Sequence, residues 1–570
     1  SLHDALPISL RFDNVQEPTL SIEDAISIAH QFFLVASGII DFFDPPWLTD
    51  ELSTWVADSS RREKPKSPII YLALAIGLQG RARDEADDVI AEQCFGYGRQ
   101  LAVFTLMDNP SLLTVQAFTL ITYYMLAACR RNGAFTNLGV AVRAAYALGI
   151  HRHETNIAFV PEEGISRERA WKTLRVCDLF LSASMGRPPG TSETGCNIPW
   201  ASLTPATDRE NSTVPSQVFS AIFRICHIFE RILVEVYSRR SVSLELAKSI
   251  SRQHREWTEE LPQTLRIDGL DGLDAVQSQG VSRPHGSIIV TMAYYYSIIL
   301  LTRPFLTFKV CNSPKKGTQN RNASSSSAEL TTYADACVDS AINGVNSAYE
   351  IVFEENMPRR QPFVINSVFI SAICLGLAYL DEYDRRGWPL RRSLERAIAI
   401  LSHFGRLSPQ SARYAEICQY LQGAAAIYID TRDNTFLQSS SQLVCSVFGD
   451  VQNSAGTRSR VRSGGLPDLP TPQQSSFNAL HYAAVVEPIL PSSLDDNTVQ
   501  QESIITPSGL LTGQYTNGND YLYQDDSDLG VLPQDFFASH SVASSGNYSY
   551  GDDVPLFSLT NDLTSGDYAW

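Results

Sequence analysis

The sequence predicts an all-α protein, in which a large multi-helix domain is followed by a disordered C-terminal tail. Apolar residues recur at helical spacing through roughly the first 430 residues, and no segment shows the strict alternation of a half-buried strand. Short connections rich in Gly, Pro, Asn and Ser separate these segments, as is typical of packed helices. From about Asn434 the composition shifts to Ser, Gly, Pro, Gln and Asn, which leaves too few apolar residues for a core.

These patterns divide the chain into four parts. Residues 1–19 form an artefactual or disordered start, 20–205 a first helical domain, 206–430 its helical continuation, and 431–570 the Ser/Gly/Pro-rich and acidic tail. A Ser-, Asn- and Lys-rich insert near 312–327 is predicted to be disordered. Helices are predicted at 21–38, 68–78, 84–104, 111–129, 138–149, 166–185, 216–238, 243–260, 287–301, 328–354, 362–381, 389–404 and 408–429.

The beginning of the chain is unusual. Ser1 to Ile8 resemble a translated sequencing adapter, and no initiator Met precedes them. We therefore exclude these residues from the fold and expect the native N-terminus to lie upstream.

Charge is distributed unevenly along the chain. All 45 Lys and Arg residues lie at or before Arg462, whereas 14 of the 62 Asp and Glu residues follow it. Residues 1–462 therefore carry a formal charge of −3 and the remainder −14. Such a chain neutralises few phosphates, so we expect it to contain no DNA-binding residues of its own.

Motifs that would indicate a catalytic or metal site are absent from the sequence. Ten cysteines, the first at Cys94, are scattered without a Cys-x-x-Cys pair, which is typical of reduced core thiols in an intracellular protein. There is no Gly-x-Ser-x-Gly and no phosphate-binding loop. The longest apolar runs are too short or too interrupted for a membrane span, so no membrane partner is expected.

Two predicted helices at 138–149 and 166–185 are central to the first domain. Gly149 is expected to end the first, and His151 and Arg152 then suit its carbonyl-rich end. Ser166 is expected to cap the second. The apolar face of the first helix is Leu138, Ala141, Val142, Ala145 and Leu148, that of the second is Trp171, Leu174, Cys177 and Leu181, and Gly186-Arg187-Pro188-Pro189 ends the second.

The landmarks of this pair occur in a distinctive order. They are Leu148-Gly149-Ile150-His151-Arg152, then Arg167-Glu168-Arg169, Trp171, Asp178 and Gly186-Arg187-Pro188-Pro189. In this order they closely resemble the regulatory middle homology domain of fungal binuclear zinc-cluster transcription factors, of the xylanolytic-activator-like type. The resemblance covers at least residues 32–200 and continues more weakly to about 430.

This resemblance implies a nuclear transcription factor that regulates RNA polymerase II genes, often metabolic ones, and not an enzyme. In that family a short N-terminal domain contacts DNA through six cysteines that bind two zinc ions. No such cysteine cluster occurs here, so DNA and zinc are implied only for a missing N-terminal segment and no cofactor is expected in this chain. A homodimer is compatible with the family.

Three polar residues in the second helix and its end allow two interpretations. Arg175, Asp178 and Arg187 either form a local ion pair that fixes the helix against the Arg-Pro-Pro turn, or take part in ligand sensing. Because a buried, unpaired charge costs several kcal/mol, we expect Asp178 to have a basic partner in either case.

Two other classes of protein remain open. A helical scaffold or interaction protein without DNA contacts would show the same helical pattern. An all-α metal-dependent cyclase would use Asp84-Glu-Ala-Asp-Asp88 with Glu92 as metal ligands. No second ligand motif at usable spacing is apparent, and a run of charges is usually a solvated helix face, so we favour that interpretation.

The final stretch, from about Gln500 to Trp570, mixes acidic with aromatic residues and contains no Lys or Arg. Acidic groups keep such a chain solvated, while its aromatic residues stay available for partners. We expect this tail to bind transcriptional coactivators. The candidate contact residues are Asp535, Phe536, Phe537, Asp552, Asp553, Leu556 and Phe557.

Overall fold

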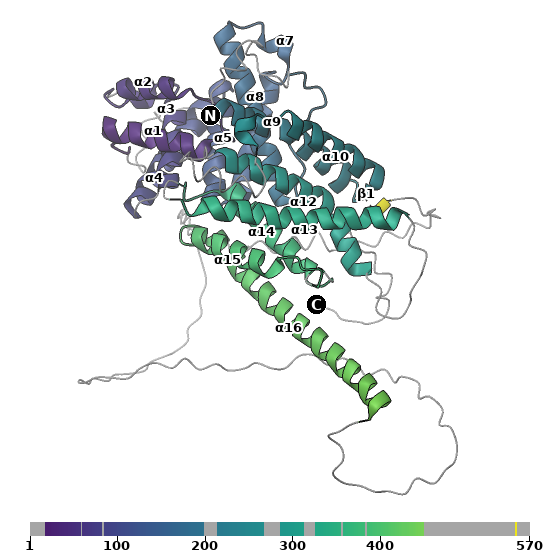
Figure 1. The fold of residues 1–570 in the computed structure, drawn as a ribbon. Coiled ribbons are helices and arrows are strands. Elements are labelled where there is room, and N and C mark those ends of the chain that lie inside the picture. The colour runs from purple at the N-terminus through teal and green to yellow at the C-terminus, as the bar shows by residue number, and fades with distance from the viewer. Residues whose placement is uncertain are drawn as a thin grey trace, which may run out of the picture. The chain divides into compact units, whose positions relative to one another are not determined.

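The described part of the protein is almost entirely helical, which confirms the predicted fold class (Figure 1). The computed structural model describes residues 17–449, apart from 59, 82–84, 199–213, 267–285, 313–324, 355–356, 382 and 384, together with 553–555. The α-helices are α1 (Ile22–Ala36), α2 (Pro45–Trp55), α3 (Ser67–Arg81), α4 (Glu85–Leu106), α5 (Leu112–Ala127), α6 (Arg131–Ala147), α7 (His153–Asn156), α8 (Pro161–Met185), α9 (Val214–Arg231), α10 (Leu244–Glu259), α12 (Gly286–Asn312), α13 (Ser325–Val352), α14 (Pro362–Ala378), α15 (Leu390–Gly405) and α16 (Pro409–Phe448). A π-helical segment, η4 (Ile232–Tyr237), follows α9, and two short strands, β1 (Ser241–Ser243) and β2 (Asp553–Pro555), pair with each other.

The helices are arranged around elements that are buried on nearly every side. In α3 every residue from Ser67 to Gly80 is buried, and α5, α8 and α14 are almost as enclosed. A helix that is apolar all round belongs in the interior, and α5 meets this condition. Around these elements, α3 packs against α1, α4 and α5, and α13 packs against α12, α14 and α15.

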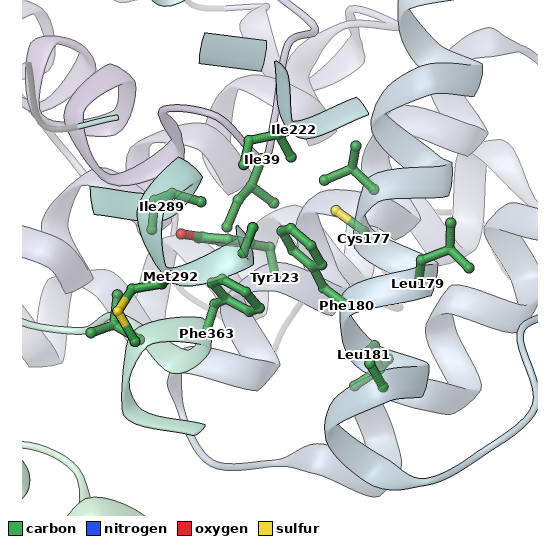
Figure 2. Packing of buried hydrophobic residues seen from close by; sticks show 14 of the residues in the cluster. Ile39, Tyr123, Cys177, Leu179, Phe180, Leu181, Ile222, Ile289, Met292 and Phe363 are labelled. Carbon is green, nitrogen blue, oxygen red and sulfur yellow. The ribbon is translucent and has the colours of Figure 1, made fainter. Parts of the chain in front are cut away.

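Aromatic side chains join the enclosed helices. Phe180 of α8 stacks on Phe363 of α14 with ring centroids 4.2 Å apart, and Tyr123 of α5 donates a hydrogen bond to the Val35 carbonyl of α1 at 2.8 Å. Figure 2 shows these rings converging with Ile39 and Ile222 on one apolar cluster. The long described segment from α1 to α14 therefore shares a single core.

Several predicted helix ends are confirmed by their capping geometry. The Ser21 side chain accepts the Asp24 N–H at 3.1 Å, and the Ser111 N–H donates to Thr114 Oγ1 at 2.9 Å in a capping box. Gly149 and Gly186 follow α6 and α8 with φ of +67° and +65°, a left-handed conformation that glycine adopts without a steric penalty.

The predicted start of α8 is wrong. Ser166 lies inside the helix and donates to the Glu162 carbonyl at 2.9 Å instead of capping the N-terminus. The helix begins at Pro161, whose fixed φ and missing N–H suit the first helical position, and Glu162 and Glu163 complement the helix dipole in the first turn.

The predicted end of the helix at 287–301 is also wrong, because α12 continues through Pro304 to Asn312. Proline removes the N–H that would bond the carbonyl four residues earlier, which here belongs to Leu300. The Tyr237 hydroxyl donates to that carbonyl at 2.9 Å and accepts from Arg303 Nη2 at 2.7 Å. A side chain from η4 thus replaces the lost backbone hydrogen bond.

The last helix is longer than predicted. α16 runs to Phe448, past the predicted domain boundary at 430, and its residues from 436 onward include the exposed side chains of Phe436, Leu443 and Phe448. The chain forms two compact units, and the described part of the second is the end of α16 from Gln438. Residues 313–324 of the predicted insert, and the tail apart from 431–449 and β2, lie outside the described residues.

One helix of the described chain, Gly286–Cys311, is long and apolar enough to span a membrane, judged by its length and composition alone. However, 78% of its most apolar window is buried within the protein. Such burial is typical of the core helix of a helical domain, as the packing of α12 against α9, α13 and α14 shows.

Stability is expected to depend on pH through His254, which lies on α10 and is buried. Its Nδ1 lies 3.1 Å from the Ile250 carbonyl and its Nε2 lies 2.9 Å from Ser297 Oγ. Burial lowers the pKa of His254 to about 4. The unfolded chain therefore binds a proton below about pH 6.5 that the folded protein does not. The contribution of neutral His254 to the free energy of unfolding is complete above pH 6.5 and is lost as the pH falls toward 4.

The size of this loss is about 3 kcal/mol, from roughly 1.4 kcal/mol for each unit of pKa shift. We expect His254→Gln to flatten the fall in unfolding free energy between pH 6.5 and 4, measured by urea denaturation. His30→Gln, at an exposed position, is the matched control and should retain the wild-type slope. Equal slopes in all three proteins would contradict this role of His254.

Candidate functional site

The family-like motif lies at the junction of α6, α7 and α8. After Gly149 the chain turns and buries Ile150, and the Asn156 side chain donates to the Ile150 carbonyl at 2.9 Å. Arg167 of α8 then bonds both Asn156 Oδ1, at 3.1 Å, and the Leu148 carbonyl, at 2.7 Å. Arg167 therefore satisfies a carbonyl at the end of α6 and fixes this turn against α8.

Three rings form the centre of the motif. Trp171 is fully buried, and Tyr146 meets it edge to face with centroids 5.6 Å apart. The His151 ring lies 5.0 Å from Tyr146 and 5.7 Å from Trp171. Burial, together with the charge of Arg152, lowers the pKa of His151, so its ring is neutral near pH 7. His151 therefore acts here as a packed aromatic ring.

The segment 187–198 closes over these rings as a loop. The Trp171 Nε1–H donates to Cys196 Sγ at 3.2 Å, the Ser192 N–H donates to the Tyr146 hydroxyl at 3.0 Å, and the Asn197 N–H donates to the His151 carbonyl at 3.4 Å. Each bond joins the loop to a different motif residue. We call residues 187–198 the clamped loop.

Asp178 holds the beginning of the clamped loop. Its carboxylate accepts the Gly190 N–H at 3.1 Å and both the N–H and the hydroxyl of Thr191 at 2.6 Å. Burial raises the pKa of Asp178, while hydrogen bonds from Thr191 and Gly190 and the charge of Arg175 oppose that rise. Backbone and hydroxyl donors are the direct hydrogen-bond partners of the carboxylate, and the basic group that acts on it is Arg175, through its charge.

Arg175 pairs with an acid that the sequence analysis did not identify. It lies one turn before Asp178, is 1% exposed, and donates to Glu230 Oε2 of α9. The other oxygen of Glu230 accepts the Glu193 N–H of the clamped loop at 2.8 Å. One carboxylate therefore joins α8, α9 and the loop.

A second pair reinforces this junction. Glu193 Oε2 lies 2.6 Å from His227 Nδ1 of α9. Burial acts to raise the pKa of Glu193, but the hydrogen bond and charge of His227 lower it overall. Glu230 could have been found in the sequence as a charged residue inside an apolar stripe, whereas nothing in the sequence near Glu193 or Thr191 points to their roles.

Arg187 and Pro188 are not part of this polar cluster. Arg187 Nη2 donates to Asn132 Oδ1 at 2.8 Å, and its guanidinium lies 4.7 Å from the centre of the Phe135 ring. Pro188 is exposed. The Gly-Arg-Pro-Pro turn is therefore fixed against α6, and Asp178 is fixed by the residues that follow the turn.

The arrangement suits a structural clamp better than catalysis. Burial raises the pKa of the Cys177 thiol to about 12 and also raises that of Cys226, so both are protonated thiols near pH 7 and poor nucleophiles. The hydrogen bonds of the clamped loop tie it to α6, α8 and α9 and to the turn at His151. The loop and these helices therefore form one polar network.

The acidic residues of α4 are bonded to cationic and hydroxyl groups. Asp87 pairs with Arg81, Asp88 with Arg360 at 2.8 Å, and Glu92 accepts from Arg130 at 2.9 Å and from the Tyr124 hydroxyl at 3.0 Å. These contacts favour a structural role over metal ligation. Among the described residues, no group of three or more metal-capable side chains is found, and Asp84 lies outside them.

The structure includes a single one of the proposed activation residues. Asp553 lies in β2, where its backbone is described. Asp535, Phe536, Phe537, Asp552, Leu556 and Phe557 lie outside the described residues.

Trp171→Ala is expected to lower the free energy of unfolding by about 3–5 kcal/mol, because a fully buried ring is replaced by a cavity. Chemical denaturation followed by circular dichroism measures the change. Ile165→Ala, on the same helix at a position that is 44% exposed, should change stability by less than about 0.5 kcal/mol. A Trp171→Ala protein as stable as wild type would refute the central role of this ring.

The Arg175–Glu230 pair gives a second prediction. Arg175→Met leaves the Glu230 carboxylate buried and is expected to destabilise the protein by about 3–5 kcal/mol. Arg175→Met combined with Glu230→Gln should recover much of this loss, because the neutral amide still accepts the Glu193 N–H. Additive losses in the double-mutant cycle would show that the two side chains act independently.

Comparison with known proteins places this site in a family. Residues 30–265 match the model of the fungal specific transcription factor domain, a range that contains the whole motif, the clamped loop and α9. The match begins inside α1 and runs beyond the predicted boundary at 205 to the end of the segment that follows α10.

Named regulators from several fungi are similar to the chain. Transcription factor FBD3 of Gibberella moniliformis is 23% identical over 48% of this chain and 37% of its own length. Transcriptional activator protein acu-15 of Neurospora crassa is 25% identical over 44% of this chain and 28% of its own. Acetamidase regulatory protein of Aspergillus oryzae is 28% identical over 46% of this chain and 33% of its own.

The matched part of the chain therefore spans only about a third of each of these relatives. The family model, the order of the motif residues and the all-α architecture nevertheless agree with one another. Residues 30–265 thus match the fungal specific transcription factor domain, and the chain is similar to fungal transcriptional regulators.

Proposed function

We propose that this chain is the regulatory and activating part of a nuclear transcription factor that controls RNA polymerase II genes, metabolic genes among them. The family match over residues 30–265 supports this most strongly. The clamped loop is the corresponding structural feature, because it joins three helices through buried polar contacts that a ligand or partner could strengthen or weaken.

We place sequence-specific DNA binding outside the residues of this chain. The near-neutral body and acidic tail offer few cations for phosphates. In the proposed protein, a preceding segment holds zinc through clustered cysteines and contacts DNA. Several buried cysteines are core thiols with raised pKa values, such as Cys94 and Cys418 at about 12, and their protonated form is a poor zinc ligand.

An enzymatic role is not part of this proposal. The acidic residues of α4 that a metal-dependent cyclase would need are bonded to Arg81, Arg360 and Arg130. A metal ion at this position would have to displace three arginines. The relatives named above are a transcription factor, a transcriptional activator and a regulatory protein, which favours regulation instead.

The tail supplies activation in this proposal. Residues 500–570 contain no Lys or Arg, so acidic groups repel one another and keep the aromatic side chains accessible. Phe536 and Phe537 follow Asp535, and Leu556 and Phe557 follow Asp552 and Asp553. Such segments can fold onto an apolar groove of a coactivator, with the acids attracted to its basic rim.

A tail fusion tests the activation proposal. Residues 500–570 joined to an unrelated DNA-binding domain should activate a reporter gene in fungal cells. Replacement of Phe536, Phe537, Leu556 and Phe557 by Ala should abolish this activity, because the apolar area that binds the coactivator is lost.

A matched control replaces four Ser or Asn residues of the same tail by Ala, and it should retain activity. Immunoblotting establishes equal amounts of each fusion. A silent wild-type fusion, or an active aromatic-to-Ala fusion, would show that the tail serves solubility and not activation.

A further inference from the structure

A short strand, β1, follows α9 and η4. The π-helical η4 ends at Tyr237, Arg240 takes a left-handed conformation with φ +56°, and the chain then extends as β1 before α10. A left-handed conformation is uncommon outside glycine. Val242 is fully buried, whereas Ser241 and Ser243 are half-buried. This backbone path turns β1 so that one edge can pair with another segment.

The segment that pairs with β1 comes from the acidic tail. β2 runs antiparallel to β1, with Ser241 opposite Pro555, Val242 opposite Val554 and Ser243 opposite Asp553. Figure 1 shows β2, in yellow, beside β1, and β2 also contacts α12. More than 300 residues of sequence separate the two strands, so the pairing is a tertiary contact between the helical body and the tail.

The register is compatible with the proline in β2. Pairs in an antiparallel ladder alternate between those that exchange two backbone hydrogen bonds and those that exchange none. Pro555 has no N–H, so the exchanging pair is Val242–Val554. The tail sequence therefore fits this register and would not fit one shifted by a single residue.

Charge favours the same docking. Ser243, opposite Asp553, is the N-cap of α10, where its side chain accepts the Leu246 N–H at 3.1 Å. The partial positive charge at a helix N-terminus attracts carboxylates. Arg239 and Arg240, both exposed, directly precede β1, whereas residues 500–570 contain no Lys or Arg.

We propose that the edge of β1 is a docking site for the acidic tail segment centred on Asp553–Pro555, and that this docking keeps the segment from coactivators. The consequence for coactivators rests on the proposed activating function of the tail. A segment that is extended against β1 cannot at the same time fold as a helix in a coactivator groove. The regulatory domain and the coactivator therefore compete for the same residues.

Removal of a single backbone N–H group from β2 tests the docking. Val554→Pro removes the N–H that β2 gives to Val242 while keeping the segment extended. Val554→Thr, the control, keeps the N–H and the strand propensity. The measured quantity is the rate of hydrogen–deuterium exchange at the Val242 amide in the full chain. We expect about three- to tenfold faster exchange in Val554→Pro, since the loss of one backbone hydrogen bond shifts the docking equilibrium by that order, and wild-type exchange in Val554→Thr.

Reporter assays then separate docking from activation. Joined to the same unrelated DNA-binding domain, the full-chain Val554→Pro protein should activate more strongly than wild type. In the isolated tail fusion the same substitution should have no effect, because β1 is absent. Unchanged Val242 exchange in Val554→Pro, or protection that appears only at high protein concentration, would overturn docking within one chain.

These measurements distinguish the two proposals. If the tail fusion is silent but Val242 exchange responds to Val554→Pro, docking stands and the proposed activation fails. If the tail fusion is active but exchange does not respond, activation stands and docking fails. Equal activity of the full-chain wild-type and Val554→Pro proteins, with altered exchange and an active tail, would overturn the competition with coactivators.

Discussion

The need to satisfy charges on a helix with no exposed face determines the arrangement around α8. From Arg167 to Ala183 nearly every side chain of this helix is buried, including Glu168, Arg175 and Asp178. Burying a charge without a partner costs several kcal/mol. Each charged residue must therefore meet a partner, and the partners come from other parts of the chain: the turn after α6, the clamped loop, and α9.

This constraint explains why the clamped loop is ordered although it contains little apolar surface. The Asp178 carboxylate accepts hydrogen bonds from the N–H groups of Gly190 and Thr191, and the Glu230 carboxylate accepts one from the Glu193 N–H. The carboxylates replace the backbone partners that a strand or helix would supply. Since Glu230 is also the partner of Arg175, a displacement of the loop changes the balance of a buried ion pair.

Sequence patterns were sufficient for features that depend on neighbours along the chain. They identified the fold class, the helix starts at Ser21 and Ser111, the glycine stops at Gly149 and Gly186, and the buried position of Trp171. They failed where a distant side chain decides the outcome. Pro304 would end an isolated helix, but the Tyr237 hydroxyl satisfies the Leu300 carbonyl and the helix continues.

The candidate site shows the same division. The motif residues could be found because they follow one another in a fixed order within 138–190. The partners of Arg175 and Asp178 could not, because Glu230 lies 55 residues from Arg175 and the contacts of Asp178 are mainly to backbone N–H groups and a threonine. A backbone donor leaves no trace in the residue type, so the sequence could not show that Gly190 and Thr191 bond to Asp178.

The clamped loop and the docking edge of β1 are connected through one continuous segment. Glu230 and His227 lie in the last turn of α9, η4 begins directly after Arg231, and Tyr237 at its end is tied to α12 before the chain reaches β1. π-helical segments are rare and often lie at functional sites. A double-mutant cycle between Glu230 and Val554 would measure the coupling free energy between the Arg175–Glu230 pair and the β1–β2 contact, and a value near zero would show that the two act independently.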